Sequence, residues 1–119
     1  MDPEEVKANE KRFFDYFNER DLDALDKWID EYVAQDFVNH SPVQNEPTDR
    51  QGLKEMVRTL FQIAPDLTIT IKEMVLENNV LCFRQILRGV GKQDELIGMT
   101  MVKFKDGKVA ERWSLNEAQ

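Results

Sequence analysis

An Asp106-Gly107 pair joins two extended, apolar-rich runs near the C-terminal end of the chain, and it is the strongest local folding signal in the sequence. The two runs cover residues 97–105 and 108–115. Asp-Gly between such runs is typical of a two-residue β-hairpin turn, because both turn positions need a positive φ. The sequence therefore predicts an antiparallel hairpin, and the other segments are expected to pack against it.

The predicted turn also sets which residues of the two runs lie opposite one another. Moving away from the turn, the expected pairs are Lys105 with Lys108, Phe104 with Val109, Val102 with Glu111, and Thr100 with Trp113. A three-residue loop would instead mix apolar and charged side chains on both faces, so the pattern favours the two-residue turn. In this register the polar residues Thr100 and Glu111 lie on the apolar face, and a ligand pocket would explain their presence there.

Composition limits the class of protein. A chain of 119 residues, 41% of them hydrophobic and 9% aromatic, can bury one core, and we expect a single domain over residues 1–119. The net charge of −7 argues against nucleic acid or an anionic membrane surface as a partner. Cys82 is the single cysteine, which excludes a disulfide framework and fits a reducing compartment. Without a secretory signal or a membrane-spanning apolar run, we expect a cytoplasmic protein.

Apolar residues recur at helical spacing in three stretches of the N-terminal half, at about 3–18, 21–32 and 48–64. The second stretch also carries acidic residues, which lie mostly opposite its apolar stripe: Asp23, Asp26, Asp30 and Glu31. They lack the ligand loop and glycine of a calcium site, so we expect them to form a solvated face.

Beyond Asp66 the apolar pattern alternates as in strands. Its phase shifts near Lys72-Glu73, which predicts a bulge that bends the sheet. Four antiparallel strands are expected, and a short extended piece at 36–42 is expected to enter a loop. The predicted fold is α+β, with three N-terminal helices packed on the concave face of a curved antiparallel sheet to give a cone-shaped α+β barrel.

Four segments of the chain resemble one known family. They are FFDYFNERDLDAL, DFVNHSP, APDLTITIKEMV and FKDGKVAERW, and together they are similar to the SnoaL-like polyketide cyclase branch of the nuclear transport factor 2-like superfamily. The resemblance covers nearly the whole chain and implies a conical pocket for a small, mostly apolar molecule. This superfamily contains cyclases, isomerases, hydrolases and non-catalytic binding modules, so the resemblance defines the fold more narrowly than the function.

The sequence departs from the cyclases at two places. Cyclases of this family carry an aspartate on the strand before the DGK turn as the general acid/base for an aldol ring closure, and the matching position here is Thr100. The segment Gly89–Gly98 is also shorter than its counterpart in the cyclases, which leaves open whether it covers the pocket. The resemblance thus implies the pocket of the family without its usual acid.

Two ionisable residues are predicted to be catalytic in place of the aspartate. An apolar cavity would raise the pKa of Glu111 toward neutrality, as a general base requires, although Glu111 could equally pair with an arginine or cap a backbone group. His40 has an ordinary pKa near neutrality, and the resemblance implies that it faces the pocket. Its alternative role is to hold the 38–43 loop through a backbone hydrogen bond.

Aromatic and polar side chains are predicted to line the pocket. The expected lining is Phe17, Trp28, Tyr32, Phe61, Gln85, Thr100 and Trp113. Gln85 would either bind the ligand or meet a structural partner. With one histidine and no His/Cys cluster, neither a metal site nor a cofactor is expected.

Two functions from different classes remain open. The first is a cofactor-free cyclase or isomerase that moves a proton next to a carbonyl group. The alternative is a non-catalytic protein that binds a small molecule and has lost the family's aspartate.

The uncovered face of the sheet is expected to form a homodimer, as the resemblance also implies, because it mixes apolar residues with arginines: Cys82, Ile86, Met99, Met101, Arg84, Arg88 and Arg112.

Overall fold

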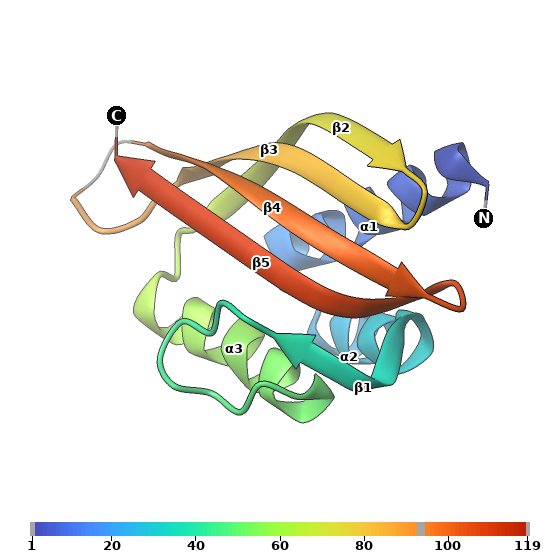
Figure 1. Cartoon of the computed structure of the whole chain (residues 1–119). Coiled ribbons are helices and arrows are strands. Elements are labelled where there is room, and N and C mark those ends of the chain that lie inside the picture. The colour runs from blue at the N-terminus through green and yellow to red at the C-terminus, as the bar shows by residue number, and fades with distance from the viewer. Residues whose placement is uncertain (1, 93–94, 119) are drawn as a thin grey trace.

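The computed structural model describes residues 2–92 and 95–118. Figure 1 shows its elements in chain order: α1 (Pro3–Glu19), α2 (Leu22–Tyr32), β1 (Val33–Asn39), α3 (Arg50–Ile63), β2 (Thr68–Glu77), β3 (Val80–Arg88), β4 (Leu96–Lys105) and β5 (Lys108–Ala118). The three predicted helices and the four later strands are all present, which confirms the α+β fold class. No helix in the described part of the chain is long and apolar enough to cross a membrane.

The strands form one sheet in the order β1-β5-β4-β3-β2. Strands β2 to β5 form the predicted antiparallel meander, but β1 lies parallel to β5 at the edge of the sheet. The curved sheet with helices on one face is confirmed, but the sheet is open and mixed, because β1 adds one parallel pair that was not predicted. Residues 36–42 were expected to lead only into a loop, and β1 was missed because a short extended segment does not reveal which strand it will pair with.

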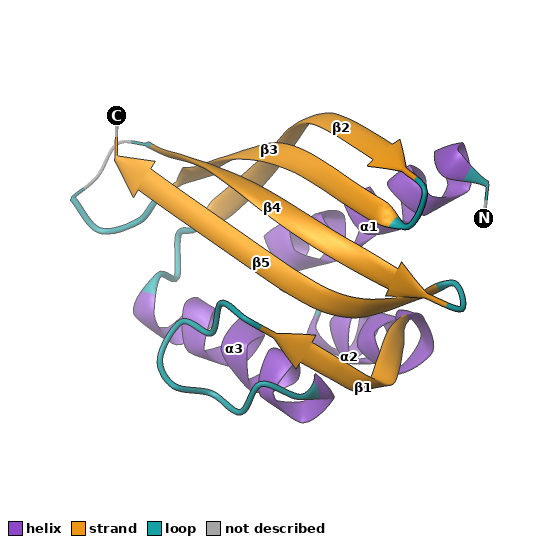
Figure 2. Cartoon of the chain, viewed as in Figure 1, coloured by secondary structure: helices purple, strands orange, loops and turns teal. Residues whose placement is uncertain are grey.

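All three helices lie on one face of the sheet, which we call the inner face, and the opposite face is the outer face (Figure 2). The largest core cluster joins the inner face to α2 and α3, and its fully buried members include Ile29, Leu81 and Phe83. The predicted bulge in β2 is confirmed, since the pairing with β3 shifts between Ile71 and Met74. This bulge bends the sheet over the helices.

The Asp106-Gly107 turn has the predicted two-residue form, with positive φ values of 53° and 79°. The first two pairs, Lys105 with Lys108 and Phe104 with Val109, are also as predicted. Beyond Val109, however, Ala110 is an extra residue on β5, and the pairing continues from Lys103 with Glu111. Ala110 therefore forms a β-bulge, and the predicted register is wrong from this point onward.

The bulge exchanges the two faces of β5. Glu111 and Trp113 pair with Lys103 and Met101 on the outer face, and not with Val102 and Thr100 as predicted. Arg112, which was expected on the outer face, is on the inner one. One physical reason is that the bulged register sets Glu111 opposite Lys103, which is a favourable cross-strand pair, and keeps the Glu111 carboxylate away from the apolar core.

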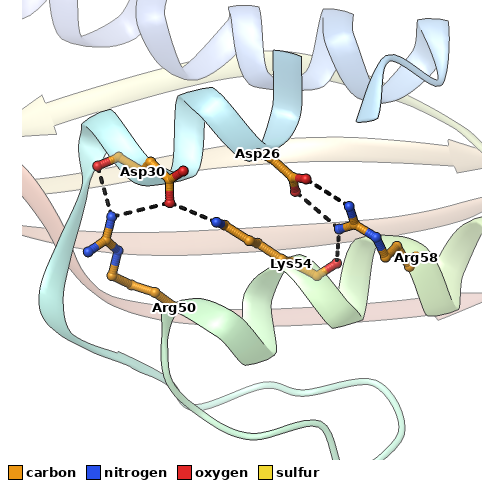
Figure 3. A network of polar contacts seen from close by, with 5 residues as sticks. All are labelled: Asp26, Asp30, Arg50, Lys54 and Arg58. Carbon is orange, nitrogen blue, oxygen red and sulfur yellow. Dashed lines mark hydrogen bonds and ion pairs between the residues drawn. The ribbon is translucent and has the colours of Figure 1, made fainter. Parts of the chain in front are cut away.

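Ion pairs clamp α2 against α3 (Figure 3). The guanidinium of Arg58 bonds the Asp26 carboxylate at 2.7 Å and 3.1 Å, and this hydrogen bonding lowers the pKa of Asp26. Lys54 Nζ lies 2.7 Å from Asp30 Oδ1. Asp23, Asp30 and Glu31 are exposed, as expected for a solvated face, whereas Asp26 is half-buried where it meets Arg58. The clamp fixes the two helices that wall the cavity described next.

Candidate functional site

A cavity of about 70 Å³, the inner cavity, lies between the helices and the inner face of the sheet. Its wall is mostly apolar and includes Phe13, Phe14, Phe17, Trp28, Met56 and Phe83. Three polar residues also line it, namely Glu10, Thr100 and Arg112. A cavity of roughly 150 Å³ holds benzene, so the inner cavity in this form accepts a small group or one end of a larger ligand.

A second cavity of about 300 Å³, the outer cavity, lies where α1 begins and the β4–β5 turn ends. Its lining includes Asp2, Glu5, Asn9, Arg12, Tyr32 and Gly107. Glu10, Trp28 and Val109 line both cavities. These three residues therefore lie between the two cavities.

Glu10 is placed in the cavity by helical geometry. It precedes Phe13 and Phe14 by three and four residues on α1, so all three side chains share one face of the helix. Only 6% of Glu10 is exposed, and burial raises the pKa of its carboxyl to about 7, while the charge of Arg112 opposes this rise. Among the residues described, no hydrogen bond or ion pair to this carboxyl is found. Glu10 thus titrates near neutral pH and is free to meet a ligand.

Arg112 reaches the inner cavity from β5 because the Ala110 bulge turns it inward. Its Nη1 donates hydrogen bonds to Asn39 Oδ1 at 3.1 Å and to the Ser41 carbonyl at 3.3 Å. Burial lowers the pKa of Arg112 to about 10, against the raising effect of Glu10, so the guanidinium stays charged at neutral pH. No bond from its Nε or Nη2 is found among the described residues, and these donors remain available to a ligand.

Asn39 holds Arg112 in this position. Asn39 is fully buried at the end of β1, and its backbone N–H donates to the Thr48 carbonyl at 2.7 Å. Its Oδ1 accepts a second bond from the Ser41 N–H at 3.0 Å besides the one from Arg112. The side-chain oxygen is therefore fixed between a backbone donor and the guanidinium, which restrains Arg112 before any ligand binds.

Thr100 lies on the inner face as predicted, but its hydroxyl is occupied. Thr100 Oγ1 donates to Gln85 Oε1 at 2.6 Å and lies 3.0 Å from Ser114 Oγ. Gln85 Nε2 donates to Ser114 Oγ at 3.1 Å and to Asn116 Oδ1 at 2.8 Å. Asn116 can approach because Gly98 opposite it has no side chain. Thr100 thus belongs to a satisfied polar network with Gln85, Ser114 and Asn116.

The two predicted catalytic residues do meet, but on the outer face. His40 Nε2 lies 3.1 Å from Glu111 Oε1, and each side chain is 37% exposed. The His40 ring stacks on Trp113 with 4.5 Å between ring centroids, and Lys103 Nζ lies 5.6 Å from the Trp113 centroid. We call these four residues the outer cluster. The expectation that Glu111 and His40 share the pocket is wrong, because the bulge directs Glu111 away from it.

The predicted pocket lining divides into two groups. Phe17, Trp28 and Thr100 line the inner cavity, and Tyr32 lines the outer one. Three other predicted residues do not line either cavity: Phe61, which packs on Phe17 at 4.9 Å; Gln85, which belongs to the Thr100 network; and Trp113. Residues 93 and 94 lie outside the described residues, so the structure does not test whether Gly89–Gly98 covers the pocket.

Sequence reasoning missed Glu10, Asn39 and Arg112. A signal for Glu10 was present, because a carboxylate three residues before Phe13 and four before Phe14 falls on the apolar face of the first helix. Asn39 is next to His40 in the sequence, and only His40 was predicted to be a site residue. Arg112 could be found only by placing the bulge, since the alternating pattern alone assigns it to the outer face.

The fold and site define a class of protein: helices and a curved sheet that enclose a small, largely apolar cavity with a few buried polar groups. The family model for SnoaL-like polyketide cyclases matches residues 9–118. The chain therefore belongs to the SnoaL-like polyketide cyclase family, which confirms the resemblance noted from its sequence. The comparison with curated proteins gives no match.

Solved structures with the same fold come from several bacteria. IdmH from Streptomyces antibioticus, named as a candidate polyketide cyclase, is 23% identical with a TM-score of 0.73, covering 98% of this chain and 93% of IdmH. TsrD from Streptomyces laurentii is 18% identical with a TM-score of 0.78, covering 98% and 91%. A candidate isomerase of the SnoaL-like family from Agrobacterium tumefaciens is 15% identical with a TM-score of 0.78, covering 93% and 96%. At these identities the similarity supports the fold alone.

Proposed function

We propose that this protein binds a small, mostly apolar carbonyl compound and moves a proton next to its carbonyl group without a cofactor, as an isomerase or cyclase. The observation that carries the proposal is the Glu10 carboxyl, which is buried, has a pKa of about 7 and lines the same cavity as the charged Arg112. A base of this pKa is partly ionised at neutral pH and is strong enough to take a proton from an activated carbon.

In the proposed reaction the Glu10 carboxylate takes a proton from the carbon next to the ligand carbonyl. The electron pair of that C–H bond forms a C=C bond, and the carbonyl π electrons move to oxygen to give an enolate. Arg112 donates hydrogen bonds to the enolate oxygen through Nη2 or Nε, and Asn39 keeps the guanidinium in place. Because these donors are positioned before the charge develops, they stabilise the enolate with little reorganisation.

The enolate then has two fates, both of which use Glu10 as the acid. If Glu10 returns its proton to a different carbon, the double bond moves and the reaction is an isomerisation. If the enolate carbon attacks a second carbonyl of the same ligand, a C–C bond closes a ring and the new alkoxide takes the proton from Glu10. Membership of a family of polyketide cyclases supports the ring closure.

Deuterium exchange into butan-2-one tests the proposal without knowledge of the natural ligand. In D₂O the wild-type protein should exchange the protons next to the carbonyl, and Glu10→Gln should lower the rate by about 10²- to 10⁴-fold, the usual contribution of a general base. The wild-type rate should rise with pH through about 7, the pKa of Glu10. Proton NMR of the ketone follows the exchange.

Two variants of the outer cluster are the matched controls. Glu111→Gln removes the same charge on the other face of the sheet, and His40→Ala removes the only histidine. Both should keep the exchange rate within about twofold of wild type, because neither side chain lines the cavities. If Glu111→Gln abolishes exchange and Glu10→Gln does not, the base is Glu111 and this proposal is overturned.

A non-catalytic binding protein is the second candidate, and the satisfied Thr100 network supports it. The Thr100 hydroxyl already donates its proton to Gln85 in a hydrogen bond. In this candidate, Thr100 therefore has a structural role in place of the acid/base role of the family's aspartate. If the protein only binds its ligand, butan-2-one should raise the melting temperature because it binds the native state alone. Deuterium exchange into butan-2-one should then be no faster with wild type than with the Glu10→Gln variant.

We also propose that the outer face forms a homodimer. Val75, Met99 and Leu115 are 63%, 57% and 81% exposed, and Met99 pairs directly with Leu115 across the two strands. An exposed apolar cluster of this kind on a sheet face favours association. Light scattering during size-exclusion chromatography should give a dimer for wild type and a monomer for Leu115→Lys. Val43→Lys is the control, because Val43 is an exposed apolar residue of a loop.

A further inference from the structure

The outer cavity is lined by more negative than positive side chains. Asp2 and Glu5, from the beginning of α1, line it together with one cation, Arg12. Partial burial, then the charge of Glu31 and a smaller effect of Glu5 raise the pKa of the Tyr32 hydroxyl, against a lowering effect of Arg12. Leaving Glu10 aside, two carboxylates therefore act against one guanidinium, and this potential favours a cationic group.

An aromatic pair completes this wall. The rings of Trp28 and Tyr32 have centroids 5.4 Å apart with an interplanar angle of 47°, and both residues line the outer cavity. The Trp28 indole is held in place because its Nε1 donates to the Asn9 carbonyl at 3.1 Å. Aromatic rings beside carboxylates are the surroundings in which alkylammonium groups bind, since the ring quadrupole attracts a cation that carboxylates also stabilise.

A second feature, independent of these charges, indicates that a ligand occupies this place. Glu10 is 94% buried, since 6% of it is exposed, and within the described ranges 2–92 and 95–118 its carboxyl has no partner. A buried carboxyl without a partner is costly in the free protein, and Glu10 lies where the two cavities meet. A ligand that spans both cavities would place a polar group beside it.

We infer that the outer cavity binds an alkylammonium group, so that the ligand of this protein has a cationic head and a compact, mostly apolar end in the inner cavity. The head would lie against Trp28 and Tyr32, with the carboxylates of Glu5 and Asp2 around it. The inference rests on the proposed function only for the carbonyl group at the apolar end of the ligand. The binding of the cationic head is inferred from the residues that line the outer cavity.

The test uses choline and its uncharged isostere 3,3-dimethylbutan-1-ol as probes. The readout is the indole N–H signal of each tryptophan in a proton–nitrogen NMR spectrum. The Trp28 signal reports on the outer cavity, which Trp28 lines, and the Trp113 signal reports on the outer face of the sheet. A Trp113→Phe variant assigns the two signals. Choline should shift the Trp28 signal saturably and leave the Trp113 signal unchanged, and it should bind about three- to tenfold more tightly than the alcohol.

Charge variants sharpen the result. Glu5→Gln should weaken choline binding by about threefold and leave the affinity for the alcohol unchanged, whereas Arg12→Gln should strengthen choline binding. Glu55→Gln is the matched control, since it removes one carboxylate from an exposed position on α3. Equal affinity for choline and the alcohol, or a choline-induced shift of the Trp113 signal alone, would overturn the inference.

The two proposals can fail separately. Choline carries no carbonyl, so its binding does not depend on proton transfer, and Glu10→Gln should lower its affinity by at most about threefold while it abolishes deuterium exchange. If the protein exchanges deuterium into butan-2-one but binds choline no more tightly than the alcohol, the proton-transfer proposal stands and the inference of a cationic head is rejected. If it prefers choline to the alcohol but shows no deuterium exchange, the inference of a cationic head stands and the protein is a binding protein.

Discussion

The two faces of β5 carry similar residues in opposite surroundings. On the inner face Arg112 shares a cavity with Glu10, whose pKa burial raises to about 7. On the outer face Glu111 meets His40 at 3.1 Å, with 37% of each side chain exposed. Both faces thus combine a carboxylate, a basic group and an aromatic residue, but water screens the outer set and is largely excluded from the inner one.

Because the two faces of β5 carry similar residues in different surroundings, residue type alone does not identify a site. His40, Glu111 and Trp113 look like an active site in the sequence, and the structure brings them together, yet they line neither cavity. Glu10 looks like one of many surface acids of a chain with net charge −7. The raised pKa of its carboxyl comes from burial, which only the packed chain completes.

Phe83→Ala should have the largest effect, because Phe83 lines the inner cavity and is only 1% exposed. Loss of the buried ring and the space it leaves should cost about 3–5 kcal/mol of unfolding free energy. Urea denaturation followed by circular dichroism measures this loss.

Ile63→Ala is the control for Phe83→Ala, because Ile63 is 51% exposed at the end of α3. It should change the free energy of unfolding by less than about 1 kcal/mol. If Ile63→Ala costs as much stability as Phe83→Ala, burial on the inner face does not set the size of the effect.

Glu10→Gln should have the next largest effect, and the effect should depend on pH. The folded pKa of about 7 lies above the ordinary value of 4.5, so the stabilising contribution of protonated Glu10 is complete below pH 4.5 and is lost as the pH rises through 7. The loss is about 3 kcal/mol. Glutamine cannot ionise, so the variant should gain stability over wild type as the pH rises from 4.5 to 8. Thermal melts across this range measure the difference.

The smallest effect is expected for Glu111→Gln, the matching change on the outer face. The carboxylate is exposed and pairs with His40 at the surface, and such pairs contribute about 0.2–1 kcal/mol. Urea denaturation at pH 7 should therefore give a change below about 1 kcal/mol. A loss as large as that expected for Phe83→Ala would mean that the outer cluster, and not the inner cavity, holds the fold together.

Much of the fold could be predicted because its signals are local. Asp2 and Pro3 begin α1, Asp106-Gly107 forms the turn, and the shift of apolar phase at Lys72-Glu73 marks the bulge in β2. In each case neighbouring residues restrict the same backbone torsions. The candidate site was less predictable, since Phe17, Trp28 and Thr100 were expected in the cavity but Glu10, Asn39 and Arg112 were not.

Periodicity and turn chemistry act over a few residues, so the helices, the hairpin turn, the curved sheet and the family can be recognised from the sequence. The face of β5 that carries Arg112, and the strand β1 that brings Asn39 beside it, follow from contacts between distant segments. A one-residue bulge reverses every side chain beyond it, and its energy depends on partners that lie far away in the sequence. The raised pKa of Glu10 has the same origin, since burial is a property of the packed chain.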